Sequence, residues 1–258
     1  MPLRTSLSIQ GEATTTLALF LFFDLDGKHP KMNWRPSQQS WKQRFQQPFH
    51  LRVSAKDTLT FHQSPFTSKT CQDPGDTGCT LWDASLVLAH LLLNKPELIQ
   101  EKRVVELGSG IGLLGVLVAY LGARHTTLSD LDSTLGILQR NIDENRHLLG
   151  NRDIQAIPIH WGDEQHTKSL PKSTEVVICS DLVYRWETVQ PLTRTLCNLC
   201  NLETKILFAQ DAHRPEVTQL FERSMQPYFY YSTVPKEWLH PEIQSEDIVV
   251  RIYQKIDW

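Results

Sequence analysis

The sequence carries no excess of basic residues. Its 26 lysines and arginines stand against 29 aspartates and glutamates, which gives a formal net charge of −3 at pH 7. Proteins that bind the phosphates of nucleic acid present a basic surface, and this composition does not supply one. We therefore expect no nucleic-acid partner.

Cysteine is also scarce. Five cysteines at irregular spacing, an odd number, do not form a disulfide framework. The composition favours a reducing compartment and predicts a cytoplasmic protein, with the nucleus as a second location. Cys197 and Cys200 form a single CxxC pair, so two buried thiols in a helix are favoured over a zinc or redox site. His125 and His213 have no ligand-like partners at suitable spacing, and we predict no metal site.

Long apolar runs are missing as well. The longest early run, Leu17 to Phe23, is far shorter than the ~20 residues that a membrane-spanning helix needs. No clear cleavage site follows it, so the sequence predicts neither a membrane contact nor a signal peptide. We expect residues 1–47 to form a poorly ordered N-terminal extension and residues 48–258 to form one domain. Met32 is an alternative start, which leaves open whether residues 1–31 belong to the native protein.

Regular patterns begin at Phe49. From Phe49 to Gln63, apolar and polar residues alternate on both sides of a short Lys-Asp turn, which predicts a β-hairpin. Residues 64–78 are rich in Pro, Gly, Ser and Asp and predict a loop. From Trp82 to Leu93 the apolar residues recur at helical spacing, which predicts a helix.

Beyond this helix, strands and helices alternate. We predict strands over 103–107, 125–130, 154–161, 175–181, 205–211, 229–234 and 247–255, and helices over 112–122, 133–149, 187–200 and 215–226. This alternation predicts an α/β fold: a Rossmann-like, doubly wound, mostly parallel seven-stranded sheet with an antiparallel C-terminal strand, preceded by the hairpin. In such sheets, ligands bind outside the carboxyl ends of the strands, near the point where the strand order reverses.

A glycine-rich turn follows the first of these strands. Residues Gly110 to Gly115 match GxGxxG, the dinucleotide fingerprint, but a single match is weak evidence. In dinucleotide-binding folds the first glycine follows the strand directly. Here the strand ends at Leu107 and the first glycine is Gly108, so the turn has the pattern GxGxG, with Leu113 in place of the third dinucleotide glycine. The match at Gly110 therefore starts two residues late, and Gly115 falls on the helix face that packs against the sheet.

Two acids accompany this turn. Glu106 lies just before the strand end, where it would repel a pyrophosphate but favour the cationic sulfonium and ammonium groups of S-adenosylmethionine. A paired acid at the sheet end is the alternative for Glu106. Asp130 ends the next strand, where a carboxylate can accept both hydroxyls of an adenosine ribose, a contact that NAD enzymes also use. Glu106, the GxGxG turn and Asp130 together favour S-adenosylmethionine as the cofactor.

The chain resembles a known family at these residues. The stretches VVELGSGIGLLG and LSDLD are similar to the seven-β-strand class I methyltransferases that use S-adenosylmethionine. Four further segments, GCTLWDASLVLAHLL, IHWGDE, ICSDLVY and SEDIVVRIY, resemble the protein-lysine methyltransferases that act on chaperones and AAA ATPases. The resemblance covers roughly Phe49 to Lys255. It implies a monomeric enzyme that methylates a lysine side chain of a protein substrate, with S-adenosylmethionine as the methyl donor.

The resemblance also assigns cofactor contacts. Trp82 is similar to the tryptophan that helps form the cofactor pocket, and Trp161 to the residue that flanks the adenine. Ser180 replaces a family alanine beside the cofactor. The other implied contacts are Gly108, Ser109, Gly110 and Asp130, and Glu106 joins them on the charge argument above.

Asp181 and Tyr184 match the Asp-x-x-Tyr motif of this group, which implies a catalytic role. Methyl transfer to an amine is an in-line displacement at an activated sulfonium, so the enzyme has mainly to align and desolvate a deprotonated lysine. Acidic and aromatic groups at the pocket rim can guide and hold that lysine. One departure concerns the substrate side: where family members carry Glu and Arg, this chain has Asp211 and, one place off, Arg214. The target protein is therefore in doubt.

Three other functions stay open. A small-molecule N-methyltransferase would use the same cofactor site with a closed acceptor pocket. A nicotinamide-dependent oxidoreductase is disfavoured by the register of the glycines. A binding module that kept the fold without catalysis is disfavoured because Glu106, Asp130 and the Asp-x-x-Tyr motif are all present. The acceptor protein, the acceptor lysine and the degree of methylation are not predicted.

Overall fold

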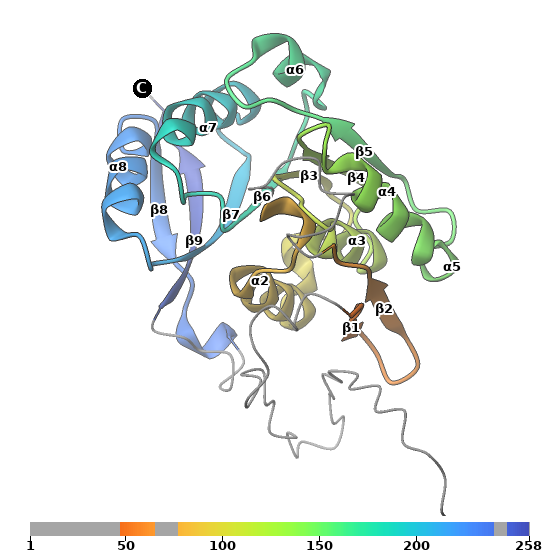
Figure 1. The fold of residues 1–258 in the computed structure, drawn as a ribbon. Helices are drawn as coiled ribbons and strands as arrows, with labels where there is room; N and C mark the ends of the chain where they lie inside the picture. The colour runs from red at the N-terminus through yellow and green to blue at the C-terminus, as the bar shows by residue number, and fades with distance from the viewer. Residues whose placement is uncertain (1–46, 65–76, 240–246, 258) are drawn as a thin grey trace, which may run out of the picture.

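The computed structural model describes residues 47–64, 77–239 and 247–257. The predicted N-terminal extension, except for its last residue, and residues 65–76 of the predicted loop lie outside the described residues, which Figure 1 draws in grey. Among the described residues, no helix is long and apolar enough to cross a membrane.

The predicted hairpin forms at the N-terminal end of the described chain. β1 (Phe49–Arg52) pairs with β2 (Thr58–Phe61) in an antiparallel register. The short 3₁₀ helix η1 (Thr77–Cys79) follows, and then α2 (Asp83–Asn94). Trp82, which was predicted to begin this helix, is its N-cap residue in an extended conformation.

A seven-stranded sheet with the order β5-β4-β3-β6-β7-β9-β8 forms the centre of the molecule (Figure 1). Five strands run parallel: β3 (Arg103–Leu107), β4 (His125–Asp130), β5 (Ile154–Pro158), β6 (Val176–Ser180) and β7 (Lys205–Asp211). β9 (Ile248–Lys255) runs antiparallel to both β7 and β8 (Phe229–Thr233). The predicted fold is confirmed, and the strand order reverses between β3 and β6.

Helices cover both faces of this sheet. They are α3 (Leu113–Tyr120), α4 (Leu135–Glu144), α5 (Arg146–Leu149), α6 (Glu164–Ser169), α7 (Trp186–Leu199) and α8 (Pro215–Met225), with short 3₁₀ turns η2 (Pro96–Leu98) and η3 (Lys236–Trp238). Successive residues of a strand point to opposite faces of a sheet. Accordingly, Val104 of β3 packs in the core beneath α2, α3 and α4, whereas its neighbour Val105 packs beneath α7 and α8.

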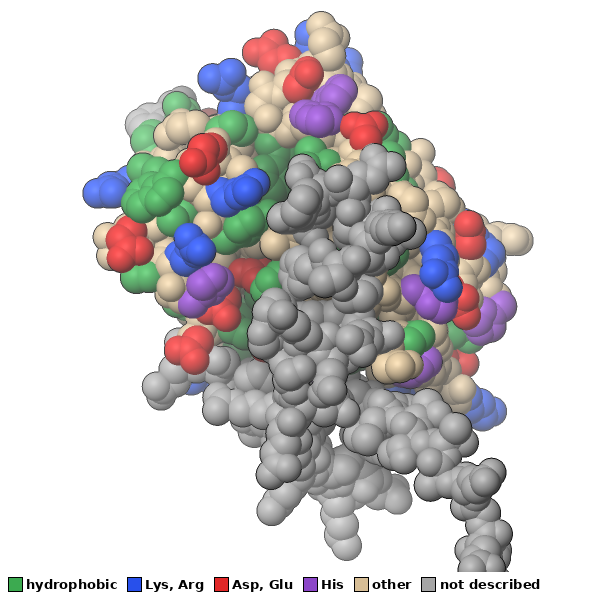
Figure 2. Space-filling view, viewed as in Figure 1, with side chains coloured by type: hydrophobic (Ala, Val, Ile, Leu, Met, Phe, Trp, Pro, Cys, Tyr) green, Lys and Arg blue, Asp and Glu red, His purple; other side chains and the backbone are tan. Residues whose placement is uncertain are grey.

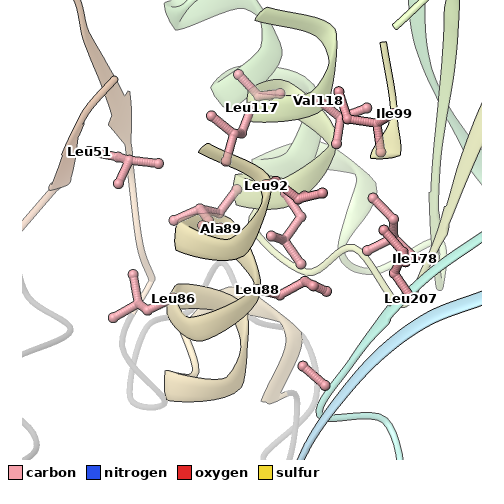
Figure 3. Close-up of a cluster of buried hydrophobic side chains, with 14 of the residues drawn as sticks. Leu51, Leu86, Leu88, Ala89, Leu92, Ile99, Leu117, Val118, Ile178 and Leu207 are labelled. Carbon is pink, nitrogen blue, oxygen red and sulfur yellow. The ribbon is translucent and has the colours of Figure 1, made fainter. Parts of the chain in front are cut away.

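The helix α2 lies between the hairpin and the sheet. Figure 3 shows Leu86 and Ala89 on the side of Leu51 from β1, whereas Leu88 and Leu92 lie toward the sheet residues. Leu88 and Leu92 are completely buried. A fully buried leucine contributes about 1.5–3 kcal/mol to stability, so these contacts fix the middle and the last turn of α2 against the sheet.

Two asparagines end the predicted 133–149 helix early and divide it into α4 and α5. The side chain of Asn145 donates to the carbonyl of Thr60 and accepts the N–H of Thr60, both at 2.8 Å. The amide of Asn141, one helical turn earlier, makes the same pair of bonds with His62, at 3.0 and 2.8 Å. Asn145 also bonds the carbonyl of Asn141 at 2.7 Å, which competes with the regular helical pattern. The edge of β2 is thereby docked on α4.

The helix α6 was not predicted. The helix begins with a common N-cap residue, Asp163. Its side chain accepts the N–H groups of Gln165 and His166 at 2.8 and 3.3 Å. With only six residues, the helix is too short to show a periodic apolar face.

Candidate active site

A pocket with a cavity volume of about 640 Å³ opens at the carboxyl ends of β3, β4 and β6, where the strand order reverses. The structure brings all ten predicted site residues together in its lining: Trp82, Glu106, Gly108, Ser109, Gly110, Asp130, Trp161, Ser180, Asp181 and Tyr184. On the face drawn in Figure 2, acidic, basic and hydrophobic side chains lie side by side over α7 and α8. The location agrees with the rule for ligand sites in doubly wound sheets.

The glycine turn forms one wall of the pocket. β3 ends at Leu107 and α3 begins at Leu113, as the predicted register requires. Gly108 and Gly110 have φ values of 62° and 54°, in the left-handed region that favours glycine. A Cβ atom on Gly110 would lie 2.8 Å from the carbonyl oxygen of Gly78, and one on Gly108 would lie 2.4 Å from a methyl group of Leu182. Only glycine lets the turn approach its neighbours this closely.

Asp130 is fastened to this turn. One carboxylate oxygen accepts the N–H of Gly110 and the other accepts the N–H of Leu131, both at 2.7 Å. A carboxylate has about four acceptor positions, which is more than these two N–H groups occupy. Ser109 holds the same turn to β4, because its hydroxyl accepts the N–H of Ser129 at 3.0 Å.

Glu106 is a buried acid in the pocket lining, with only 3% of its surface exposed. Its carboxylate accepts the N–H of Gly115 at 2.9 Å. Burial raises the pKa of Glu106 to about 8, and the negative charge of Asp130 acts in the same direction, against the hydrogen bonds from Ser109 and Gly115. Gly115 leaves room for this acid, because a Cβ there would lie 2.7 Å from the Glu106 carboxylate and closer still to Leu128. This close packing confirms the predicted position of Gly115 against the sheet.

The segment η1 connects two aromatic residues of the site. The carbonyl of Thr77 accepts a hydrogen bond from the indole N–H of Trp82 at 2.9 Å. The hydroxyl of Thr77 donates to the hydroxyl of Tyr184 at 3.1 Å. The side chain of Tyr184 is therefore held in place at the pocket lining, and its hydroxyl proton remains available as a donor.

Asp181 occupies the first position after β6 and has φ of +56°, which is uncommon for a residue other than glycine. Its carboxylate accepts a hydrogen bond from the amide of Gln210 at 2.9 Å. Burial raises the pKa of Asp181 to about 6. The backbone N–H of Asp211 and the nearby His213 lower this pKa, whereas the carboxylates of Asp211 and Asp83 raise it. Asp181 is thus mostly ionised at pH 7 and protonated below pH 6.

Two further predicted residues complete the lining. The hydroxyl of Ser180 lies 3.0 Å from that of Ser85, so Ser180 links β6 to the first turn of α2. Trp161 faces the glycine turn, because a Cβ on Gly108 would lie 3.2 Å from its indole ring. Trp161 follows β5 and lies on the side of the pocket formed by β4 and β5.

The residues at and after the end of β7 lie closer to the pocket than was predicted for His213. His213 was predicted to be an ordinary loop histidine, but it lines the pocket together with Arg214. The Asp211 carboxylate accepts the backbone N–H of His213 at 2.9 Å and lies 3.1 Å from its ring nitrogen. Asp211 therefore contacts the lining residue His213 and also affects the charge of Asp181 directly.

The cysteine pair was predicted to be two buried thiols in a helix, but Cys197 of α7 is only half-buried and Cys200 follows the last residue of α7. Cys200 is buried, and burial raises its pKa to about 12, so its thiol is not reactive at neutral pH. The carbonyls of Cys197 and Cys200 both accept hydrogen bonds from the ammonium of Lys255. Among the described residues, no group of three or more His, Cys, Asp or Glu residues is placed to hold a metal ion.

Two residues that hold the predicted catalytic side chains were not predicted from the sequence. Thr77 and Gln210 form hydrogen bonds to Tyr184 and Asp181, which are distant in the sequence. No local pattern marks such contacts. The only signal for Gln210 is a polar residue inside an otherwise apolar strand, where the side chain is 3% exposed.

The described side chains fit S-adenosylmethionine. Glu106 is a buried acid whose ionised form has no cation beside it in the pocket lining and would be stabilised by a positively charged ligand group. Asp130 at the end of β4 can accept hydroxyl groups, and the turn at Gly108 and Gly110 presents backbone without side chains. A pyrophosphate close to Glu106 and Asp130 would be repelled.

Comparisons with known proteins support these findings. Residues 65–226 match a family model described as lysine methyltransferase. The chain is 31% identical to EEF1A lysine methyltransferase 3 of Xenopus tropicalis over 174 residues, which is 67% of this chain and 72% of that protein. It is 32% identical to calmodulin-lysine N-methyltransferase of Arabidopsis thaliana over 117 residues, 45% of this chain and 38% of that protein.

A solved structure shares the fold. The 16S rRNA N2 G1207 methyltransferase of T. thermophilus, in complex with AdoMet and guanosine, has a TM-score of 0.53 and 16% sequence identity. The similarity covers 81% of this chain and 50% of that chain.

Proposed function

Because this chain belongs to the lysine methyltransferase family and is an S-adenosylmethionine-dependent methyltransferase, we propose that its acceptor is a lysine of a chaperone or an AAA ATPase. When bound, S-adenosylmethionine supplies a methyl group on an already activated sulfonium. The residues of the chain then have to bind both partners, exclude water and keep the acceptor nitrogen unprotonated.

We propose that the end of the pocket formed by β3, β4 and β5 holds the cofactor. Glu106 balances its positive charge, Asp130 accepts its ribose hydroxyls and Trp161 flanks its adenine. The turn from Gly108 to Gly110 and the side chains of Trp82 and Ser180 complete this half. The proposal is supported by the common pocket that these residues line and by the acids at its base.

The other end of the pocket, after β6, receives the acceptor lysine. Asp181 attracts the ammonium group by Coulomb attraction and can take its proton, since a pKa of about 6 lies close to the working range of a general base. The hydroxyl of Tyr184, held by Thr77, positions the nitrogen once it is neutral. The observation that carries this proposal is that Asp181 and Tyr184 line the same pocket as Glu106 and Asp130.

The choice of a chaperone or AAA ATPase rests on the Asp-x-x-Tyr segment and on the resemblance from Phe49 to Lys255. Within this class, the segments resemble the lysine methyltransferase of valosin-containing protein, so that AAA ATPase is our first candidate. The similar proteins from Xenopus tropicalis and Arabidopsis thaliana are named for EEF1A and calmodulin, which are therefore the competing candidates.

Transfer from labelled cofactor to purified proteins tests the proposal. The acceptors are valosin-containing protein, an Hsp70 chaperone, EEF1A and calmodulin, each with its lysines mapped by mass spectrometry after the reaction. We expect methyllysine on valosin-containing protein or the chaperone. Label on EEF1A or calmodulin alone would show that the acceptor is neither a chaperone nor an AAA ATPase. Label found only in small molecules would favour a small-molecule N-methyltransferase.

We further propose that the enzyme works as a monomer in the cytoplasm and nucleus. The four described cysteines form no disulfide with one another, which agrees with a reducing compartment. Light scattering after size exclusion tests the monomer, and tagged protein in living cells tests the location.

A further inference from the structure

We propose that Gln210 is a positioning residue for the acceptor lysine: its buried amide holds the loop from Asp181 to Val183, so that the Asp181 carboxylate faces the pocket in one fixed orientation. This inference rests on the proposed function, because it assigns to Gln210 the support of the group that receives the lysine.

The four hydrogen bonds of the Gln210 side chain go to this loop and to the end of its own strand. Its oxygen accepts the N–H of Val183 at 3.0 Å. Its nitrogen donates to the carboxylate of Asp181 at 2.9 Å, to the carbonyl of Val183 at 3.3 Å and to the carbonyl of Asp211 at 3.1 Å. The side chain is 3% exposed, so no water competes for these bonds.

The loop needs such support because its backbone is strained. Asp181 has φ of +56°, and a residue other than glycine persists there only where the surroundings fix it. The N–H of Asp181 donates to the carbonyl of Ala209 at 2.9 Å. Two successive residues of β7 therefore hold the loop, Ala209 through its backbone and Gln210 through its side chain.

The hydrogen bond from this amide also favours one charge state of Asp181. A hydrogen bond donated to a carboxylate favours the ionised form. The titratable groups that act on Asp181 are Asp83 from α2 and Asp211 and His213 from the end of β7. Two of these three groups are acids, whose negative charges disfavour the ionised form of Asp181. Gln210 is neutral, and the hydrogen bond that it donates favours the ionised form. Removing it shifts the pKa of Asp181 upward.

If Gln210 only filled space in the core, its removal would change neither the orientation nor the pKa of Asp181. A methionine of similar volume can fill the same buried site, because Gln210 lies in a strand whose backbone pairs with Val249 independently of the side chain. What methionine cannot do is bind Val183 and Asp181. Gln210→Met therefore separates packing from positioning.

The experiment uses the full chain and three variants: Gln210→Met, Gln210→Glu and the control Asn145→Leu. Asn145 is a buried amide with two hydrogen bonds to Thr60, outside the pocket, so its loss matches the polar change without touching Asp181. The acceptor probe is the mixture of valosin-containing protein, an Hsp70 chaperone, EEF1A and calmodulin. Transfer is measured from pH 5.5 to 9 with saturating cofactor, beside cofactor affinity by calorimetry.

We expect Gln210→Met to lower turnover about 10- to 100-fold, the effect of a misplaced reacting group, while cofactor affinity stays within a factor of about three. The acid limb of its pH profile should move up by roughly one pH unit. Gln210→Glu should move that limb further, because a second carboxyl would compete with Asp181 for one proton. Asn145→Leu should lower thermal stability without moving the pH profile.

Normal turnover and an unchanged pH profile for Gln210→Met would overturn the inference and leave the proposed function intact. If the wild-type chain labels no lysine, the proposed function fails instead. In that case, carbon NMR of the Asp181 carboxyl, assigned with Asp181→Asn, decides the remaining point. A titration that is the same in wild type and Gln210→Met would overturn the inference, and an upward shift would support the part of it that concerns Asp181.

Discussion

At the ends of β3 and β4, the acids of the pocket bind backbone N–H groups, whereas at the ends of β6 and β7 the polar residues bind other side chains. Glu106 and Asp130 accept hydrogen bonds from the backbone of Gly115 and Gly110. Asp181 is held by the side chain of Gln210, and Tyr184 by that of Thr77. The two halves of one pocket are thus built from different components.

This difference has a consequence for the acceptor. A backbone donor remains when its side chain is replaced, provided that the backbone keeps its path, so the bonds from Gly110 and Gly115 to the two acids do not depend on a donor side chain. The Tyr184 hydroxyl depends on the side chain of Thr77, and the Asp181 carboxylate depends on that of Gln210 beside the backbone N–H of Asp211. We therefore expect single substitutions in the acceptor half to leave cofactor binding in place.

The sharpest test of this comparison removes the acceptor groups. Tyr184→Phe deletes only the hydroxyl, and Asp181→Asn removes the charge at nearly constant shape. Loss of one transition-state hydrogen bond typically costs about 2.7–4 kcal/mol, or 10²–10³ in rate, so turnover should fall by that factor with cofactor affinity unchanged. Turnover with saturating cofactor and calorimetry measure the two quantities. A parallel fall in cofactor affinity would place these residues in the cofactor half.

The matching change in the cofactor half is Asp130→Ala. It leaves the ribose hydroxyls unpaired and also frees the N–H of Gly110, so cofactor binding should weaken by about 1–3 kcal/mol. Calorimetry with S-adenosylmethionine or its demethylated product measures the change. NAD should not bind wild type or variant. Tight binding of NAD without any response to S-adenosylhomocysteine would contradict the assignment of the pocket.

A smaller effect is expected from the buried acid. Since the pKa of Glu106 is raised to about 8, the free enzyme holds a proton there at pH 7, and a cationic ligand should drive it off. Calorimetry at pH 7 in buffers of different ionisation enthalpy should show release of up to one proton, and none with Glu106→Gln. Equal heats in all buffers for the wild type would mean that Glu106 stays protonated beside the cofactor.

The pH dependence of stability provides a second test of the raised pKa of Glu106. An acid whose pKa is higher in the folded than in the unfolded state lowers stability as the pH rises from its ordinary range toward 8. Glu106→Gln keeps an oxygen that can accept the N–H of Gly115 but carries no charge. The variant should therefore gain melting temperature relative to wild type at pH 8 and show little difference at pH 4.5.

The smallest effect is expected at the N-terminus. A chain that begins at Gln47 lacks the residues before the hairpin but keeps every described residue that lines the pocket. Its melting temperature should rise on addition of S-adenosylmethionine as much as that of the full chain. A folded shorter chain that no longer responds would show that residues 1–46 contribute to the cofactor half.

Much of the fold was predictable because it depends on local patterns. β3, β4 and β7 have the predicted bounds, since runs such as Arg103–Leu107 are bounded by turn residues. The division between α4 and α5 was not predictable, because it depends on Asn145 reaching Thr60, 85 residues away. Local signals cannot reveal that an asparagine in a helical pattern binds a distant strand.

The site residues also differ in how far the sequence could predict them. Glu106, Gly108 and Asp130 belong to adjacent strand ends and a glycine pattern, which indicated both their position and their charge preference. Trp161 and Ser180 came from the family resemblance alone. Thr77 and Gln210 were missed, since their importance lies in contacts across 107 and 29 residues. The strand ends and the glycine turn could be predicted from the sequence. The contacts between side chains far apart in the sequence could not.

Asn141 and Asn145 have an effect beyond joining the hairpin to α4. The outer edge of a two-stranded hairpin presents N–H and carbonyl groups on which a strand of another molecule can form, the first step of edge-to-edge aggregation. Two amides one helical turn apart occupy these groups on Thr60 and His62, in the place that a third strand would take. The amide of Asn141 extends this contact to the carbonyl of Ile111 beside the glycine turn, at 2.8 Å. The helix thereby shields the hairpin from self-association and ties its edge to the wall of the pocket.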